Sequence, residues 1–315
     1  MATVVVRRCP ADQNMLRRFF SSSACLLLLI APAYAGETAT SAKAKPFGMP
    51  TKTYQSQGWL VQESNTFRVF CMPDLPEAKR LPEACETLRR QLQDTWFGAA
   101  AADWSPRCDV VVHASVAGYV RELGAGSRNS SGCATLDIKR GAVIKRRIDL
   151  RADADDWLIS ALPHELTHII LAEKFTDQQI PRWADEGMAI LTEPVARQAV
   201  RRKAMQRAVA RATRYSAQEL TSIRDYPQGD GRDAFYGQSA SLVAYLIERD
   251  SPERFLEFVK LGQKHGFERA LTEIYRINSL AELDARWQLQ LLDRGQSAEL
   301  FAARIARITA GKMID

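Results

Sequence analysis

The chain has 315 residues, of which 46% are hydrophobic and 25% are charged, and its formal net charge is +6. This composition is typical of a globular protein and excludes collagen-like, coiled-coil and wholly disordered chains. The longest apolar run, A-C-L-L-L-L-I-A at residues 24–31, is far shorter than the ~20 residues that cross a bilayer, so an integral membrane protein is not expected.

Residues 1–35 have the pattern of an export signal peptide. Arg17 and Arg18 precede the apolar run, and A-Y-A at residues 33–35 provides the small residues of a cleavage site. We therefore expect cleavage after Ala35 and a periplasmic or secreted protein. Cleavage lowers the formal net charge from +6 to +3, because the signal contains four arginines and one aspartate. This small excess, without basic motifs interleaved with aromatic residues, does not indicate nucleic-acid binding.

Residues 36–52 predict a flexible linker, and residues 53–315 a single domain. The first half of this domain, residues 53–152, has strand patterns at residues 66–71, 109–113, 133–138 and 143–150, and helix patterns at residues 76–96 and 115–123. The second half, residues 153–315, has only helix patterns, at residues 157–175, 184–215 (one or two helices), 239–247, 252–262, 267–275 and 280–292. This order predicts an α+β fold with a small mixed sheet followed by helices.

Four cysteines follow the predicted signal, all in the sheet-bearing half: Cys71, Cys85, Cys108 and Cys133. An even number of cysteines in an exported chain predicts two disulfides, in any of three connectivities. A four-cysteine zinc site is the alternative, but the sequence contains no C-x-x-C pair to favour it.

The first helix pattern of the second half contains the motif H-E-L-T-H at residues 164–168. Residues four apart on a helix lie on one face, so His164 and His168 can bind one metal ion. Glu165 points in a different direction around the helix axis and cannot reach the same ion, but it can reach a water bound to the ion, as a general base must. The chain has only four histidines, so a chance match to this motif is rare.

A zinc site that keeps one position open for water needs a third protein ligand. The segment P-R-W-A-D-E-G-M-A at residues 181–189 offers Glu186 on a second helix pattern, and an antiparallel return of the chain would bring it beside the histidines. Asp185 is the nearest competitor, but adjacent helical residues point ~100° apart, so only one of the two should face the metal. The sequence therefore predicts one Zn2+ per chain, bound by His164, His168 and Glu186.

The two motifs H-E-L-T-H and W-A-D-E-G-M-A resemble those of the gluzincin zinc metallopeptidases, in particular the peptidase MA-like domains and, more distantly, the large zinc aminopeptidases. The resemblance implies a zincin-like fold with Glu186 as the glutamate ligand. It also implies that Glu193 supports a ligand histidine, the alternative being a solvated helix residue. The chain has no G-A-M-E-N-like segment, so aminopeptidase activity is not implied.

The run A-F-Y-G-Q-S-A-S-L-V-A-Y-L at residues 234–246 also resembles the C-terminal part of the MA-like domain. By this resemblance Tyr236 occupies the region where related enzymes have a tyrosine that donates to the oxyanion. Tyr226 and Tyr245 are alternatives for this role, and a tyrosine packed at a helix start is the structural alternative for Tyr236.

Together these features predict an exported zinc metallohydrolase, most simply a peptidase in which Glu165 takes a proton from water as it attacks a carbonyl of a peptide or protein substrate. A non-catalytic cell-envelope binding module with a structural zinc is the alternative from another class, and an amidase of cell-wall peptides is the alternative among hydrolases. A helix pattern without acidic residues predicts a solvated basic face, the alternative being peripheral contact with an anionic envelope surface. Its cations are Arg197, Arg201, Arg202, Lys203, Arg207, Arg211 and Arg214.

Overall fold

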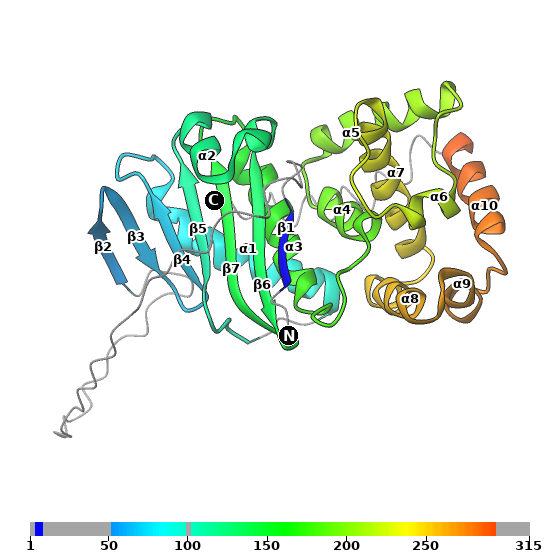
Figure 1. The fold of residues 1–315 in the computed structure, drawn as a ribbon, viewed down its shortest axis with the longest axis horizontal. Coiled ribbons are helices and arrows are strands. Elements are labelled where there is room, and N and C mark those ends of the chain that lie inside the picture. The colour runs from blue at the N-terminus through cyan, green and yellow to red at the C-terminus, as the bar shows by residue number, and fades with distance from the viewer. Residues whose placement is uncertain (1–3, 9–51, 99–101, 294–315) are drawn as a thin grey trace, which may run out of the picture.

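The structure of the protein, a computed structural model, describes residues 4–8, 52–98 and 102–293. A mixed β-sheet with helices against one of its faces forms one end of the molecule, and a group of helices forms the other end (Figure 1). The predicted α+β fold, with a mixed sheet first and helices after it, is therefore confirmed. No helix in the described ranges is long and apolar enough to span a bilayer.

The sheet has seven strands in the order β1-β6-β7-β5-β4-β3-β2. The strands are β1 (Val4–Arg8), β2 (Lys52–Ser56), β3 (Trp59–Glu63), β4 (Phe67–Cys71), β5 (Cys108–His113), β6 (Gly132–Lys139) and β7 (Ala142–Arg151). The pairs β4–β5 and β5–β7 are parallel, and the other neighbouring pairs are antiparallel. The four predicted strands correspond to β4, β5, β6 and β7, whereas β1, β2 and β3 were not predicted.

Strands β2 and β3 form a hairpin at the edge of the sheet. Gln57 and Gly58 connect them, with φ angles of 51° and 83°, the combination that a type I′ turn requires. Lys52, the last residue of the predicted linker, already belongs to β2. The rest of that linker lies outside the described residues.

Strand β1 pairs with β6 along the opposite edge, from Val4 with Ile138 to Arg8 with Ala134. This strand belongs to the segment that the predicted signal cleavage would remove. The apolar run and the cleavage site of that signal lie outside the described residues. The export prediction therefore stays a prediction, and in a cleaved chain β6 would be the edge strand.

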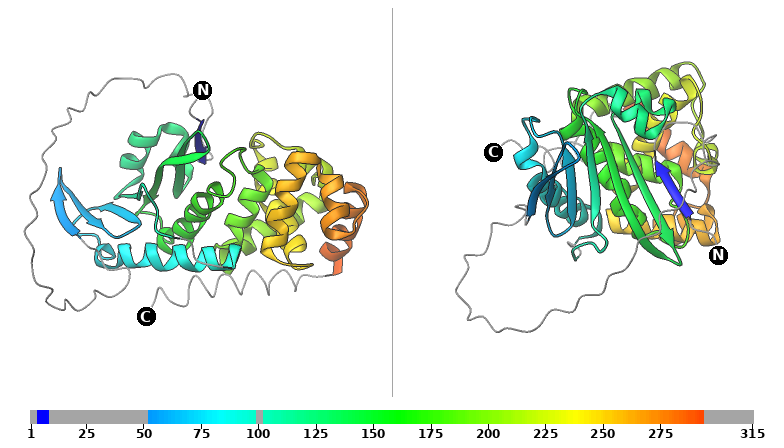
Figure 2. Two further views of the ribbon diagram at one scale, coloured as in Figure 1. Left: turned by 90° about the horizontal axis from the view of Figure 1, so that it is seen from below. Right: turned by 60° about the vertical axis from the view of Figure 1, so that its left-hand side comes forward.

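Ten α-helices are described: α1 (Leu81–Phe97), α2 (Val116–Leu123), α3 (Leu162–Ala172), α4 (Arg182–Leu191), α5 (Val195–Ala210), α6 (Ala217–Ser222), α7 (Asp230–Ile247), α8 (Pro252–His265), α9 (Phe267–Tyr275) and α10 (Leu280–Asp293). Helices α1 and α3 cover one face of the sheet, and α4 to α10 continue away from it (Figure 2). The predicted start of the helix at 239–247 was wrong, because α7 begins nine residues earlier. The predicted helix at 157–175 begins as a π-helical turn at Trp157–Ala161, and the pattern at 184–215, which allowed one or two helices, forms two.

The prediction of two disulfides is wrong, because all four cysteines are buried free thiols. Cys71, Cys85 and Cys108 belong to the hydrophobic core between the sheet and α1, where a thiol packs as a small apolar group. Burial raises the pKa of Cys71 to about 11, so this thiol stays protonated at neutral pH. In the described part of the chain, the four-cysteine zinc site has no support either, because the group of potential metal ligands contains no cysteine.

Helix α4 is held by an aromatic cluster on one side and by close backbone packing on the other. The Trp183 side chain is fully buried, and its ring contacts the rings of Phe255, Phe258 and Phe267 edge-on. At Gly187 the helix crosses α7, where an added Cβ would lie 2.4 Å from Val243 Cγ2 and 2.6 Å from the backbone oxygen of Ser239. Only glycine allows this approach of the two helices.

Replacement of Gly187 with alanine should therefore destabilise the protein. The added methyl group meets a backbone oxygen of α7, and overpacking of this kind costs about 1–3 kcal/mol. Gly118→Ala in α2 is a matched control, because the nearest atom to its added Cβ is 3.9 Å away. Helix propensity predicts that this control is neutral or stabilising by up to ~1 kcal/mol. Urea unfolding followed by circular dichroism measures both, and equal stability of the Gly187→Ala variant and wild type would contradict the packing described.

Candidate metal centre

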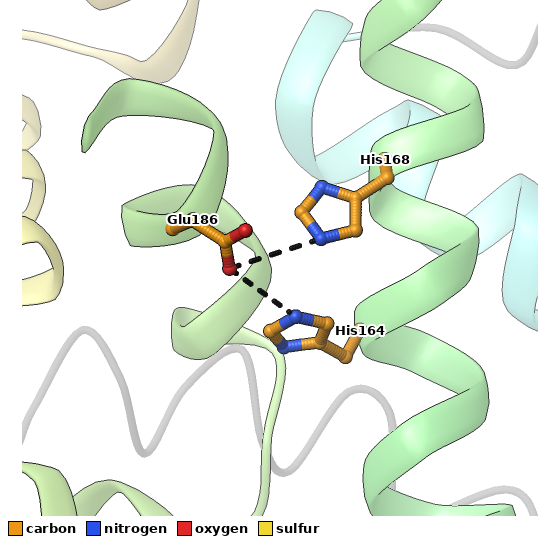
Figure 3. A group of neighbouring side chains, drawn as sticks. All are labelled: His164, His168 and Glu186. Carbon is orange, nitrogen blue, oxygen red and sulfur yellow. Dashed lines mark ion pairs between the residues drawn. The ribbon is translucent and has the colours of Figure 1, made fainter. Parts of the chain in front are cut away.

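Helix α3 presents both histidines of the H-E-L-T-H motif toward α4. His164 and His168 are one helical turn apart, and their ring centroids are 4.9 Å from each other. Pro163, which precedes the first histidine, lies in the first turn of α3, where its missing N–H is tolerated. Glu186 points back at both rings from the second turn of α4 (Figure 3).

The ligand atoms of these three residues converge on one point. Glu186 Oε2 lies 3.5 Å from His164 Nε2 and 3.9 Å from His168 Nε2. One ligand atom from each of the three residues lies within 4.8 Å of the other two, close enough for a single ion to bind all three. The structure therefore brings the three predicted ligands together.

The outer nitrogen of each imidazole contacts a further carboxylate. Glu193 Oε1 lies 2.9 Å from His164 Nδ1, and Asp185 Oδ1 lies 2.9 Å from His168 Nδ1. Such contacts set the ring orientation and leave the two Nε2 atoms facing Glu186. Glu193 thus lies where the resemblance implies, whereas Asp185 supports a histidine instead of competing for the metal. This role of Asp185 was not predicted from the sequence, although the ~100° between adjacent helical residues indicates that Asp185 and Glu186 face different partners.

The residues present fit a zinc ion. Two imidazole nitrogens and one carboxylate oxygen form a donor set of the kind found in catalytic zinc sites. In addition, four carboxylates gather around the two imidazoles, and each of these residues is at most 5% exposed: Glu165, Asp185, Glu186 and Glu193. Burying so much negative charge is costly unless cations or protons balance it.

Without a metal, protons and hydrogen bonds provide that balance. Burial disfavours a charge on His164, but the contacts with Glu186 and Glu193 raise its pKa to about 10. Burial likewise opposes ionisation of Glu186, yet the two histidine charges and the hydrogen bond from Tyr226 lower its pKa to about 2. A metal ion held by these residues would therefore take the place of a proton on His164.

Glu165 is buried beside the ligands without being one of them. A Cβ added to Gly132, the first residue of β6, would lie 2.6 Å from Glu165 Cγ. The sheet therefore leaves room for this side chain only because residue 132 is glycine. The Glu165 charge acts on both His164 and Tyr236, raising the pKa of each.

Two of the three candidate tyrosines lie at the site. The Tyr226 hydroxyl donates to Glu186 Oε1 at 2.5 Å, and its ring centroid is 6.2 Å from that of Tyr236. Tyr236 is 7% exposed, and burial, together with the charge of Glu186, raises its pKa. Tyr245 instead lies under the guanidinium of Arg249, and none of its described interactions involves the site. The sequence alone did not distinguish among these three residues.

The comparisons with known proteins agree with this geometry. Residues 142–293 match a family model described as the peptidase MA superfamily. The matched range begins with β7 and ends with α10, so it contains the three ligands, Glu165 and both tyrosines. The resemblance stated from the two motifs is thereby confirmed. No curated protein matches the chain.

Zinc affinity should increase with pH well beyond the range expected of an ordinary histidine. Because the pKa of His164 is raised from 6.5 to about 10 in the metal-free protein, the ring is protonated at neutral pH and must lose this proton to bind a metal. Affinity should therefore rise about tenfold per pH unit from about pH 7 to about pH 9. Competition with a chromophoric chelator measures it.

The variant Glu193→Gln is the control for this measurement, because it removes one of the carboxylates that raise the pKa of His164. Its affinity should stop rising at a lower pH than that of wild type. A wild-type affinity that is constant above pH 7 would contradict the description of the site.

Proposed function

Because residues 142–293 belong to the peptidase MA superfamily, we propose that the protein is a zinc-dependent peptidase. The observation that carries this proposal is the convergence of His164, His168 and Glu186, with Glu165 buried beside them. We also propose that the protein is exported and acts on peptides or proteins outside the cytoplasm. Support for export is the N-terminal sequence pattern.

The chain supplies three ligands and the groups that orient them. His164 Nε2, His168 Nε2 and Glu186 Oε2 would hold the ion, with Glu193 and Asp185 fixing the imidazole rings. When bound, zinc would act as a Lewis acid, polarising the substrate carbonyl and lowering the pKa of the water that it holds. The Tyr226 hydroxyl restrains the second oxygen of Glu186, so that Oε2 keeps facing the histidines.

Glu165 is the general base of the proposed reaction. It follows His164 directly on α3, and its burial against Gly132 restricts the positions that its carboxylate can adopt. In the reaction it takes a proton from the attacking water and then delivers a proton to the leaving amine. The fold contributes to this step by positioning the Glu165 carboxylate against the sheet.

Tyr236 is the better candidate for the donor to the developing oxyanion. Burial raises its pKa, so its hydroxyl remains protonated and can donate at neutral pH. Tyr226 also lies at the site, but its proton is already donated to Glu186. The two tyrosines therefore have separate roles, one toward the substrate and one toward a ligand.

Contact of the basic helix with an anionic surface has less support than the sequence suggested. Four of the seven cations identified in the sequence contact carboxylates of the same chain. These pairs are Arg197–Asp156, Arg201–Asp233, Arg211–Asp230 and Arg214–Asp284. The Arg201 and Arg211 pairs are weak, because each is 3.8 Å long with an exposed carboxylate. The two hydrogen-bonded pairs, Arg197–Asp156 and Arg214–Asp284, leave the alternative of a binding module that docks through this helix with fewer available charges than its sequence implies.

Glu165→Gln should keep the metal and lose the reaction. Metal analysis should find one zinc per chain in wild type and variant, because Glu165 is not a ligand, while hydrolysis of a peptide library should fall at least ~100-fold without the base. Glu268→Gln, an exposed position on α9, is the matched control and should behave as wild type. Retained hydrolysis in Glu165→Gln would remove Glu165 as base, and absence of zinc in wild type after reconstitution would end the proposal.

The pair Tyr236→Phe and Tyr226→Phe separates the two proposed tyrosine roles. Loss of an oxyanion donor should lower kcat of Tyr236→Phe by ~100-fold or more, with zinc affinity unchanged. Tyr226→Phe should instead weaken zinc binding, because Glu186 loses its hydrogen bond. Chelator competition and steady-state kinetics on both variants measure this. The reverse pattern would assign the roles the other way round.

A further inference from the structure

Arg182 lies on the same face of α4 as Glu186, one turn nearer its N-terminus. Its guanidinium is 4.4 Å from the centre of the Tyr226 ring, whose hydroxyl binds Glu186. Its Nε donates to the backbone oxygen of Arg224, which fixes the side chain over this ring. Within the described part of the chain, no carboxylate lies within ion-pair distance of Arg182, so its charge is available to a ligand.

Arg201 and Arg232 flank the other tyrosine. The Arg201 guanidinium of α5 is 4.9 Å from the centre of the Tyr236 ring. Arg232 precedes Tyr236 by one turn on α7, and both arginine charges counteract the burial that raises the pKa of Tyr236. Gly237 explains why α5 comes so close, because an added Cβ would lie 2.4 Å from the backbone oxygen of Arg201.

Neither of these two arginines is firmly neutralised within the described residues. Arg232 donates to the backbone oxygen of Pro227 and to the amide oxygen of Gln228, both uncharged acceptors. Arg201 has one carboxylate contact, with Asp233 Oδ1 at 3.8 Å, and the Asp233 side chain is 62% exposed. An exposed pair at this distance contributes little, so a buried carboxylate of a ligand can replace it.

The negative charge of the metal centre explains why arginines are needed beside Tyr226 and Tyr236 if an anionic substrate is to bind. Four buried carboxylates surround the metal position, and one divalent ion balances only half of their charge. The remaining negative charge repels an anionic substrate. Three guanidinium groups beside Tyr226 and Tyr236 place positive charge near the site, and guanidinium groups bind carboxylates through paired hydrogen bonds.

We propose that Arg182, Arg201 and Arg232 bind a carboxylate of the substrate close to the scissile bond, so that the enzyme prefers acidic peptides. This inference rests on the proposed peptidase function and names its substrate class. The carboxylate belongs either to an Asp or Glu side chain or to the C-terminus of the peptide. The rival explanation is that the arginines only offset the charge of the metal centre, in which case they affect all substrates alike.

Matched peptides distinguish these explanations. Zinc-loaded enzyme is given fluorogenic peptides that differ only in Asp or Glu against Asn or Gln at positions flanking the cleaved bond, and in a free against an amidated C-terminus. Wild type should cleave one acidic member of a pair at least ~10-fold faster in kcat/KM, equivalent to one strong charge-assisted contact. The pair that shows the preference identifies the source of the carboxylate.

The three single variants Arg182→Gln, Arg201→Gln and Arg232→Gln should lose most of this preference, measured as the ratio of kcat/KM for the acidic and neutral members of a pair, so that a general loss of activity cancels. Arg269→Gln is the matched control, because this arginine is on α9 and pairs with Glu273. Equal cleavage of both members of every pair by wild type overturns the proposal. An equal loss on acidic and neutral peptides in the variants also overturns it, and favours the rival explanation.

Binding to zinc-loaded Glu165→Gln protein separates this inference from the proposed function. Fluorescence anisotropy with the same labelled peptides needs no turnover. If wild type cleaves no peptide but acidic peptides bind more tightly than their amides, and the arginine variants abolish the difference, the anion site stands and the peptidase proposal fails. If the binding affinities of acidic and amide peptides are equal, the anion site is wrong whatever the enzyme cleaves.

Discussion

The structure depends on how four buried carboxylates around two imidazoles are balanced. Glu186 faces the Nε2 atoms of both rings, and Asp185 and Glu193 contact the outer nitrogens. Such an arrangement is expensive in a protein interior unless positive charge is present. A proton on His164 meets part of this need, and a divalent cation meets more of it while using the ligand geometry that α3 and α4 create. The negative charge that remains gives the nearby arginines a role at the same site.

Close packing around the site places the carboxylates where this balance is possible. Gly187 lets α4 cross α7 at close range, and Trp183 anchors the same helix in an aromatic cluster. On the other side, Gly132 of β6 leaves space for Glu165. The sheet, α3, α4 and α7 therefore all contribute to the site: α3 and α4 carry the side chains, α7 packs against α4, and the sheet packs against Glu165. This explains how a site formed by two short motifs requires most of the domain.

Local sequence periodicity predicted the ligands and not their surroundings. The spacing of four in H-E-L-T-H determines a helical face, and W-A-D-E-G-M-A continues on the next helix, so both could be read directly. The contact of Asp185 with His168 and the arrangement of arginines beside the tyrosines depend on how helices cross, which periodicity does not contain. The disulfide prediction failed for a related reason. An even number of cysteines in an exported chain favours disulfides in general, but which thiols lie within bonding distance depends on how the core packs. The hairpin of β2 and β3 was missed because both strands are short and neither alternates clearly: β2 is mostly exposed, and the buried residues of β3 are adjacent.

X-ray absorption at the zinc edge of the purified, reconstituted protein tests the central claim most directly, because it reports which atoms bind the ion. The account predicts a first shell of nitrogen and oxygen at ~2.0–2.2 Å, with multiple scattering from two imidazoles and no sulfur. A shell of sulfur at ~2.3 Å would mean that cysteines bind the zinc. That result, or a spectrum without imidazole scattering, would contradict the metal centre of His164, His168 and Glu186.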